Sequence, residues 1–291
     1  MVKKSIEFPM PTKMEGTAMP TQFSLQRIDW MVTLRALDIH GYATLPGLIS
    51  EAQCLELAAA EATEVTTLET LSGVGAGFCQ GSVCMLVNPC SVVGYLEALL
   101  YPPLNLLANV WSERSGSSYR FPASPQALVT ECAEWGQHRT LSYLSCYGVD
   151  DCERLHHCVR GEQRVFPFQA VVLLSSTEHD FLGGELLIAR QDERAPTATF
   201  NVQAQQGDVV LLAVKRKPRR EAGDLVWSTL RHGVQPVRSG QRKALNLVFH
   251  RGNGSDEDFS SPERYVRAGP GVSLADFGPG IASQDIGVSH E

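Results

Sequence analysis

The stretch from Leu155 to His250 constrains the fold of this chain more than any other part. It consists of short apolar runs rich in Val, Leu, Ile and Phe, separated by Gly, Pro and Asp. Such runs are typical of strands in an antiparallel barrel or jelly roll. His156 and His157 stand near the first run and His232 stands near the last. The pattern therefore predicts a barrel whose mouth can bring a histidine from each end together as a metal site.

Composition narrows the class of protein. The chain has 291 residues, 43% of them hydrophobic, and a net charge of −7, so no overall positive field attracts nucleic acid or anionic membrane. No segment approaches the ~18 consecutive apolar residues of a membrane span, and the N-terminus lacks the apolar run of a secretory signal. We therefore expect no membrane partner and a cytoplasmic location.

The eight cysteines form neither a CxxC pair nor a zinc-finger spacing. A disulfide framework needs an oxidising compartment, so most of them are expected to be thiols that act as small core residues. Cys146, Cys152 and Cys158 are set apart, because they crowd the approach to the predicted metal site.

The order of the patterns predicts a helical first half and a β-rich second half. We expect a flexible leader over residues 1–24, one domain over 25–251 whose barrel begins near residue 139, and a flexible tail over 252–291. Helices are expected at 29–40, from Ser50 to about Leu68, from Ser91 to a stop at Pro102-Pro103, at 104–111, and from Ser124 to about Trp135. A short strand and turn are expected at 41–49, and the helices should pack on the sheet.

Several segments together carry a resemblance to a known family. They are Gly41–Leu48, Tyr101–Leu104, Arg120–Ala123, Tyr147-Gly148, Val165–Gln169, Asp180–Glu185 and Leu230–Val234. With these segments the chain resembles the iron(II)/2-oxoglutarate-dependent oxygenases, and more closely a prokaryotic-type family within them. The resemblance spans roughly Leu34 to Arg251. It implies a mainly β fold with helical support, namely a double-stranded β-helix, which is a jelly-roll or cupin-like barrel.

The resemblance also implies a metal site. In that superfamily a His, an acid two residues later and a distal His bind Fe(II). The distal His corresponds to His232. Reading forward from Tyr147 makes His156 the first ligand and puts Cys158 in the place of the acid, whereas reading backward from Phe166 selects His157. We prefer the first alignment and expect His156, Cys158 and His232 as the metal ligands.

The cosubstrate site is implied in the same way. Arg242 follows His232 by ten positions and corresponds to the residue that binds a carboxylate of 2-oxoglutarate, a task that suits the planar guanidinium fork. The alternative is that Arg242 only belongs to a polar turn. Tyr147 is expected beside the cosubstrate, and Gln169 and Arg231 in the substrate pocket.

Cys158 leaves several readings open. Its thiolate could ligate iron, or it could leave a gap for halide, as in halogenases of this superfamily. Oxidation to a sulfinate could imitate a carboxylate, or Cys158 could be only a small residue at a vacated position. Another acid could also take the place of the missing ligand, and the candidates are Asp150, Asp151, Glu153 and Glu162. A structural zinc site with His156, Cys158 and His232 is the weakest reading, since no fourth ligand is evident.

The leading hypothesis is an oxygenase that uses iron(II), 2-oxoglutarate and O2 to oxidise a C–H bond, with decarboxylation of 2-oxoglutarate to succinate. The rival is a catalytically silent barrel that serves as a binding or regulatory module. The basic block Lys215–Arg220 could contact a nucleic-acid backbone, although a solvated loop is the favoured explanation. The residues identify no primary substrate.

Overall fold

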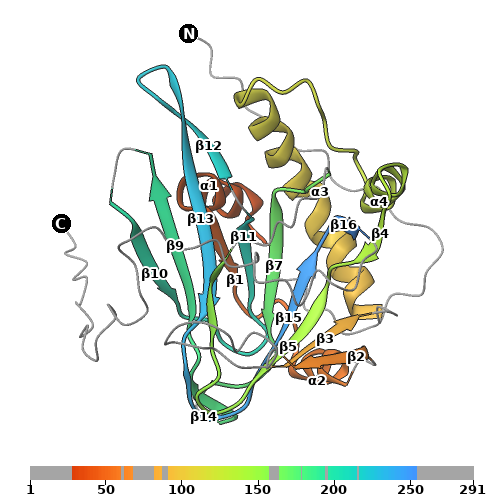
Figure 1. The fold of residues 1–291 in the computed structure, drawn as a ribbon, viewed down its shortest axis with the longest axis vertical. Coiled ribbons are helices and arrows are strands. Elements are labelled where there is room, and N and C mark those ends of the chain that lie inside the picture. The colour runs from red at the N-terminus through yellow and green to blue at the C-terminus, as the bar shows by residue number, and fades with distance from the viewer. Residues whose placement is uncertain are drawn as a thin grey trace.

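The computed structural model describes residues 28–59, 62–67, 82–86, 91–156, 164–177, 179–193, 196–214 and 216–253 (Figure 1). For residues 62–67 and 82–85 it describes the backbone alone. The predicted leader and tail lie outside the described residues, except for 252 and 253, and so do His157, Cys158, Glu162 and Lys215.

Two antiparallel sheets form the centre of the molecule. The larger has the order β1 (Tyr42–Leu45), β11 (Val209–Ala213), β7 (Phe168–Leu173), β15 (Arg242–Val248), β5 (Tyr143–Tyr147), β3 (Ser82–Leu86) and β2 (Ala62–Thr67). The smaller has the order β10 (Ala198–Val202), β9 (Leu186–Asp192), β13 (Asp224–Val234) and β12 (Arg216–Glu221). Two short pairs complete the strands, β8 (Phe181–Gly183) with β14 (Val237–Gly240) and β4 (Gln137–Thr140) with β16 (Arg251–Asn253).

The strand β13 pairs with β9 along one edge and is long enough to pair with two further strands along the other. Its first half pairs with β12, while its second half pairs with β6 (Glu153–His156). Along the chain, β5, β7, β11 and β15 go to the larger sheet, whereas β6, β9, β10 and β13 go to the smaller one. This interleaving of four strands of the larger sheet with four of the smaller one is a double-stranded β-helix, so the predicted fold class is confirmed.

Helices cover the larger sheet on its outer side. They are α1 (Trp30–His40), α2 (Glu51–Ala58), α3 (Ser91–Arg114) and α4 (Pro125–Glu134). Figure 1 shows α3 and α4 on one side of the barrel and the smaller sheet on the opposite side. Strands β7 and β11 are buried along their whole length, because the barrel interior covers one face and helices cover the other. In β13 buried and partly exposed residues alternate instead, since only one face of the smaller sheet meets the core.

The helix starts agree with the sequence. Asp29 caps α1 by accepting a hydrogen bond from the Val32 amide. Ser50 and Gln53 form the predicted capping box of α2, and Ser124 caps α4.

Two predictions about helices are wrong. The prolines Pro102 and Pro103 do not stop α3, which continues to Arg114. Both lie on its more exposed side, where water can satisfy the carbonyls that lose a donor, while Leu100, Leu104 and the rest of the apolar face hold the helix in the core. The helix that begins after Ser50 ends at Ala58 instead of about Leu68, and residues 62–67 form β2. That segment is rich in Thr and Val, which favour strands.

Two further observations bear on the expected environment. None of the described helices has both the length and the apolar character that crossing a membrane requires. Cys54, Cys132 and Cys146 are not disulfide-bonded, whereas Cys152, one of the three cysteines set apart in the sequence, is disulfide-bonded.

Candidate metal and cosubstrate site

His156 and His232 meet in the barrel. They are Cα partners across β6 and β13, and their ring centroids lie 4.6 Å apart at an interplanar angle of 52°. His232 is buried, and the His156 side chain is only 10% exposed. The pairing of the first and the last part of the barrel therefore brings together the two histidines that the sequence singled out.

An irregularity in β6 shapes this meeting. His156 pairs with His232 and Glu153 pairs with Val234, so three steps along β6 correspond to two steps along β13. One extra residue in a strand is a β-bulge, which turns a side chain to the other face. Glu153 consequently shares a face with His156, and its Oε1 lies 3.6 Å from His156 Nε2.

Gly233 makes room for the bulge. A Cβ at this position would lie 2.4 Å from the Glu153 carbonyl oxygen and 2.9 Å from the Arg154 carbonyl carbon. Both are backbone atoms, so no side-chain rotation would relieve the clash. The backbone of β6 can approach β13 here only because residue 233 has no side chain.

Each of the two histidines makes a hydrogen bond that fixes its ring. His156 Nδ1 lies 3.0 Å from the Arg154 carbonyl oxygen, which can only accept, so Nδ1 carries a proton. Gln169 donates from its Nε2 to His232 Nε2 over 3.0 Å. The lone pair of His232 Nε2 therefore accepts this hydrogen bond, and Gln169 would have to move before His232 could bind a metal ion through that atom.

Arg242 and Tyr147 form the second part of the site. They are Cα partners across β15 and β5, and both are almost fully buried. The Arg242 Nε and the Tyr147 hydroxyl have no hydrogen-bond partner among the described residues. Burial lowers the pKa of Arg242 and raises that of Tyr147 well above its ordinary value, and the negative charge of Glu153 adds to the rise at Tyr147.

In the motif Gly183-Gly184-Glu185, the second glycine provides space for the Arg242 side chain. Gly184 has φ +65°, and a Cβ there would lie 2.9 Å from Arg242 Cδ, so glycine lets the arginine stem pass. Arg242 also borders a cavity of about 200 Å³, although neither His156 nor His232 lines it. A buried guanidinium with unused donors beside a cavity and a tyrosine hydroxyl is suited to a small carboxylate.

The other predicted site residues are distributed as follows. Gln169 contacts His232 directly, but Arg231 is not brought to the histidines, and its guanidinium instead donates to Gln191 Oε1 over 3.4 Å. Cys158 lies outside the described residues. Among the residues that the structure does describe, no group of three or more His, Cys, Asp or Glu side chains already has the arrangement of a metal site.

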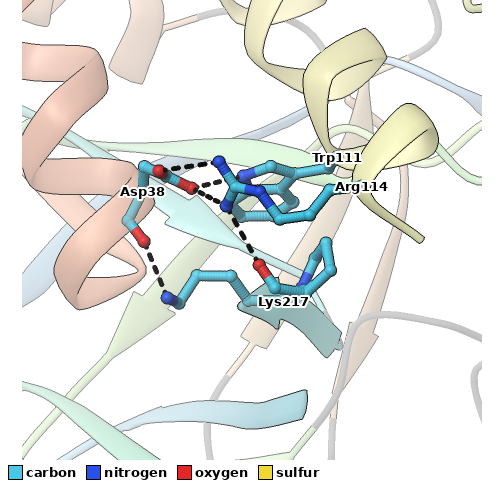
Figure 2. Close-up of polar contacts among 5 residues, drawn as sticks. Asp38, Trp111, Arg114 and Lys217 are labelled. Carbon is cyan, nitrogen blue, oxygen red and sulfur yellow. Dashed lines mark hydrogen bonds and ion pairs between the residues drawn. The ribbon is translucent and has the colours of Figure 1, made fainter. Parts of the chain in front are cut away.

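A second polar centre was not predicted from the sequence. Figure 2 shows the Asp38 carboxylate of α1 accepting hydrogen bonds from the two terminal guanidinium nitrogens of Arg114, at 2.7 and 3.1 Å. It also accepts one from the Trp111 indole nitrogen at 2.7 Å. The Lys217 ammonium donates to the Asp38 carbonyl oxygen over 2.7 Å. Burial would raise the pKa of the Asp38 carboxyl, but the bonds from Arg114 and Trp111 outweigh it and lower this pKa.

This centre corrects the interpretation of the basic block. Arg216–Glu221 is the strand β12 rather than the solvated loop that the sequence favours. Lys217 is 1% exposed, and burial lowers its pKa. A cavity of about 570 Å³ opens beside it and is lined by Asp38, Ile39, His40, Arg114, Arg190, Asp192, Lys217, Arg219, Arg220 and Ser228. Five arginine or lysine side chains against two aspartates make this groove cationic in an acidic protein.

The cationic groove and the histidines share one face of the smaller sheet. Ser228 and His232 are both on β13, and residues at every second position of a strand point the same way. Asp192 and Arg190 pair with Ser228 and Leu230, and Lys217 pairs with Ser228, so these side chains belong to that face too. The four steps from Ser228 to His232 amount to about 13 Å.

Comparison with known proteins agrees with this architecture. Residues 87–252, more than half of the chain, match the Oxygenase-NA family, described as "Oxygenase, catalysing oxidative methylation of damaged DNA". Two proteins of Mycobacterium tuberculosis, Uncharacterized protein Rv2227 of strain H37Rv and Uncharacterized protein MT2286 of strain CDC 1551, are each 34% identical over 167 residues. That match covers 56% of this chain and 71% of each relative.

Similar solved structures include two bacterial oxygenases. A Pseudomonas putida prolyl-4-hydroxylase has a TM-score of 0.46 and 15% identity, over 76% of this chain and 98% of that one. A 2OG-Fe(II) oxygenase family oxidoreductase from Burkholderia pseudomallei has a TM-score of 0.45 and 16% identity, over 78% of this chain and 94% of that one. On the evidence of the family match, which confirms the resemblance found in the sequence, this chain belongs to the Oxygenase-NA family of oxygenases.

Proposed function

We propose that this protein is an iron(II)/2-oxoglutarate-dependent oxygenase that acts on nucleic acid. The observation that carries the first part is the pair His156 and His232, whose rings face each other inside the barrel with centroids 4.6 Å apart. Imidazole nitrogen is a suitable ligand for iron(II). The buried, unpartnered donors of Arg242 and Tyr147 fit the second requirement, a small dicarboxylate.

Each residue has a separate role in this proposal. His156 and His232 hold the metal, and the Arg154 carbonyl fixes the His156 ring. Arg242 binds the distal carboxylate of 2-oxoglutarate, and the Tyr147 hydroxyl donates to it. The apolar residues around Arg242, among them Leu173 and Phe181, exclude water. When bound, iron(II) and 2-oxoglutarate supply the oxidation of a substrate C–H bond by O2, with release of succinate and carbon dioxide.

Anaerobic titration tests this directly. Apoprotein with iron(II) and 2-oxoglutarate should develop a metal-to-ligand charge-transfer band in the visible, because the cosubstrate chelates the metal. His232→Ala should abolish the band, whereas His138→Ala, at an exposed histidine of β4, should leave it intact. Succinate should then form under oxygen. If the wild type shows no band and releases no succinate, the rival function, a catalytically silent binding barrel, is correct.

The nucleic-acid part rests on the cationic groove. Arginine binds phosphate bidentately, and Arg190 and Arg219 line the groove on the same sheet face as the histidines. They pair with Leu230 and Val226, which lie two and six positions along β13 from His232. Enzymes that modify a base hold the backbone outside and bring the base into the site. The groove is placed to hold phosphates while a base reaches the barrel interior. The described activity of the family, on damaged DNA, supports the same substrate class.

Salt-dependent binding tests the groove. Binding of a fluorescent single-stranded oligonucleotide should weaken in Arg190→Ala and Arg219→Ala, and each should reduce the salt slope by about 0.7. Arg120→Ala is the matched control, because Arg120 is exposed on the α3–α4 connection, away from the groove. Equal loss in the control, or an unchanged slope in the groove variants, would contradict the proposal.

A further inference from the structure

We infer that the aromatic rings of Tyr42 and Phe200 hold an unpaired nucleobase by stacking, at the point where the cationic groove enters the barrel. The inference rests on the proposed action on nucleic acid and deepens it. It assigns two residues to the part of the substrate that the groove itself does not recognise, the planar base. The two residues lie far apart in the sequence, and only the fold brings them together.

The two rings meet where the sheets approach each other. Tyr42 is on β1 and Phe200 is on β10, which are edge strands of the larger and the smaller sheet. Their ring centroids lie 5.8 Å apart at an interplanar angle of 45°. Both residues are only partly buried, so ring surface remains accessible beside the contact. An accessible aromatic face is a surface on which a planar base can stack.

Each ring also contacts a residue that lines the cationic groove. The central guanidinium carbon of Arg190 lies 5.6 Å from the Phe200 ring centroid, and the His40 ring centroid lies 6.3 Å from that of Tyr42. Arg190 and His40 both line the groove. The groove and the aromatic pair are therefore continuous, and a nucleotide whose phosphate contacts Arg190 can present its base to the two rings.

On its other side the pair adjoins the histidines. Phe200 and His232 are both Cα partners of Ile188, one from each neighbouring strand, so their side chains share one face of the smaller sheet. With strands about 4.8 Å apart, the backbones of Phe200 and His232 are about 10 Å apart. His232 in turn pairs with His156. A base stacked on Phe200 consequently lies next to the two histidines.

Stacking supplies a selection that the groove lacks. Arginine and lysine contacts to phosphate do not depend on the base. An aromatic face accepts any base, because every base has a π face, but it gives nothing to a sugar-phosphate chain alone. In a duplex both faces of a base are covered by its neighbours, so the pair selects a single strand or an extruded base.

Two probes of equal length test the inference without relying on turnover. One is a fluorescent single-stranded oligonucleotide, and the other is the same chain built from stable abasic tetrahydrofuran residues. The wild type should bind the chain with bases more tightly, by about fivefold or more. Phe200→Leu and Tyr42→Leu keep apolar volume but lose the aromatic face, so this preference should disappear. The salt slope should not change, because neither variant removes a charge.

Matched variants separate stacking from loss of structure. Phe200→Trp and Tyr42→Phe keep an aromatic ring and should retain the preference. Trp135→Leu changes a tryptophan that is 46% exposed at the end of α4, on the opposite side of the barrel from the smaller sheet (Figure 1), and it should leave the preference intact. Thermal unfolding should show that all these variants are folded.

The remaining outcomes distinguish the inference from the proposed function. If Phe200→Leu and Tyr42→Leu keep the preference for bases, or weaken both probes equally, the inference is overturned. Weaker binding in Arg190→Ala and Arg219→Ala would in that case leave the action on nucleic acid standing. A wild type that binds neither probe would overturn the nucleic-acid part of the proposed function, and the inference with it.

Discussion

His156 and His232 face each other across the β6–β13 pair, with ring centroids 4.6 Å apart, directly beside a β-bulge. Residues at the two ends of the barrel sequence thus lie side by side, and the bulge brings Glu153 Oε1 to 3.6 Å from His156 Nε2. The approach of the two strands depends on one residue without a side chain, Gly233. The geometry of the site is therefore sensitive to changes in the backbone as well as in the ligands.

Gly233→Ala should destabilise the protein by about 1–3 kcal/mol, because its Cβ would collide with two backbone atoms of β6. It should also weaken metal binding, since β6 carries His156. Urea unfolding and a cobalt(II) titration followed by its visible ligand-field bands measure the two effects. Gly94→Ala is the control: Gly94 is exposed in α3, and an added methyl group would have nothing within 4 Å, so alanine should stabilise by about 0.5–1 kcal/mol. Equal stability of the two variants would contradict the packing argument.

Arg242→Lys should weaken 2-oxoglutarate binding tenfold or more while leaving the affinity for metal alone unchanged. Lysine keeps the positive charge but loses the planar fork that binds a carboxylate with two hydrogen bonds. The charge-transfer titration measures cosubstrate affinity, and cobalt titration measures the metal. Arg120→Lys changes an exposed arginine on the connection between α3 and α4, and it should have no effect. Unaltered cosubstrate affinity in Arg242→Lys would remove Arg242 from the site.

Asp38→Asn should destabilise the protein by about 1–2 kcal/mol near neutral pH, because it removes the charge that Arg114 and Trp111 contact. The pKa of Asp38 is lowered in the folded protein, so its contribution is complete above the ordinary pKa and is lost as the pH falls through the folded pKa. The difference in unfolding free energy between the wild type and Asp38→Asn should therefore shrink as the pH falls through the folded pKa. A double-mutant cycle with Arg114→Met should give a coupling energy, and additive effects would contradict a direct interaction.

His250 should make the protein less stable in mild acid. It is fully buried, neither ring nitrogen has a hydrogen-bond partner among the described residues, and burial lowers its pKa from 6.5 to about 4. The unfolded chain therefore takes up a proton first, and stability falls between pH 6.5 and 4 by up to about 3 kcal/mol. His250→Leu should remove this slope in urea titrations, whereas His138→Gln, at an exposed histidine, should not. If the unfolding free energy of His250→Leu still falls between pH 6.5 and 4, other titrating groups cause the pH dependence.

Local patterns predicted much of the architecture. The caps at Asp29, Ser50 and Ser124 start helices as expected, because capping depends on neighbours within one turn. The apolar runs at 168–173 and 209–213 became the fully buried strands β7 and β11. The sequence predicted that Pro102 and Pro103 end the helix, but α3 continues through them. The burial of its apolar face outweighs the lost hydrogen bonds, and this burial depends on the rest of the fold.

The sequence by itself indicated the barrel, because the alternation of strands and turns is a property of the chain, and its resemblance to a known family singled out His156, His232 and Arg242. Tertiary structure alone decided which acid approaches His156 and how the basic block is used. The bulge at Glu153 exists only where β6 meets β13, and Lys217 is buried only because β12 meets α1 at Asp38. Both depend on strands and helices far apart in the sequence, whose contacts are set by packing and pairing, and no local spacing encodes them.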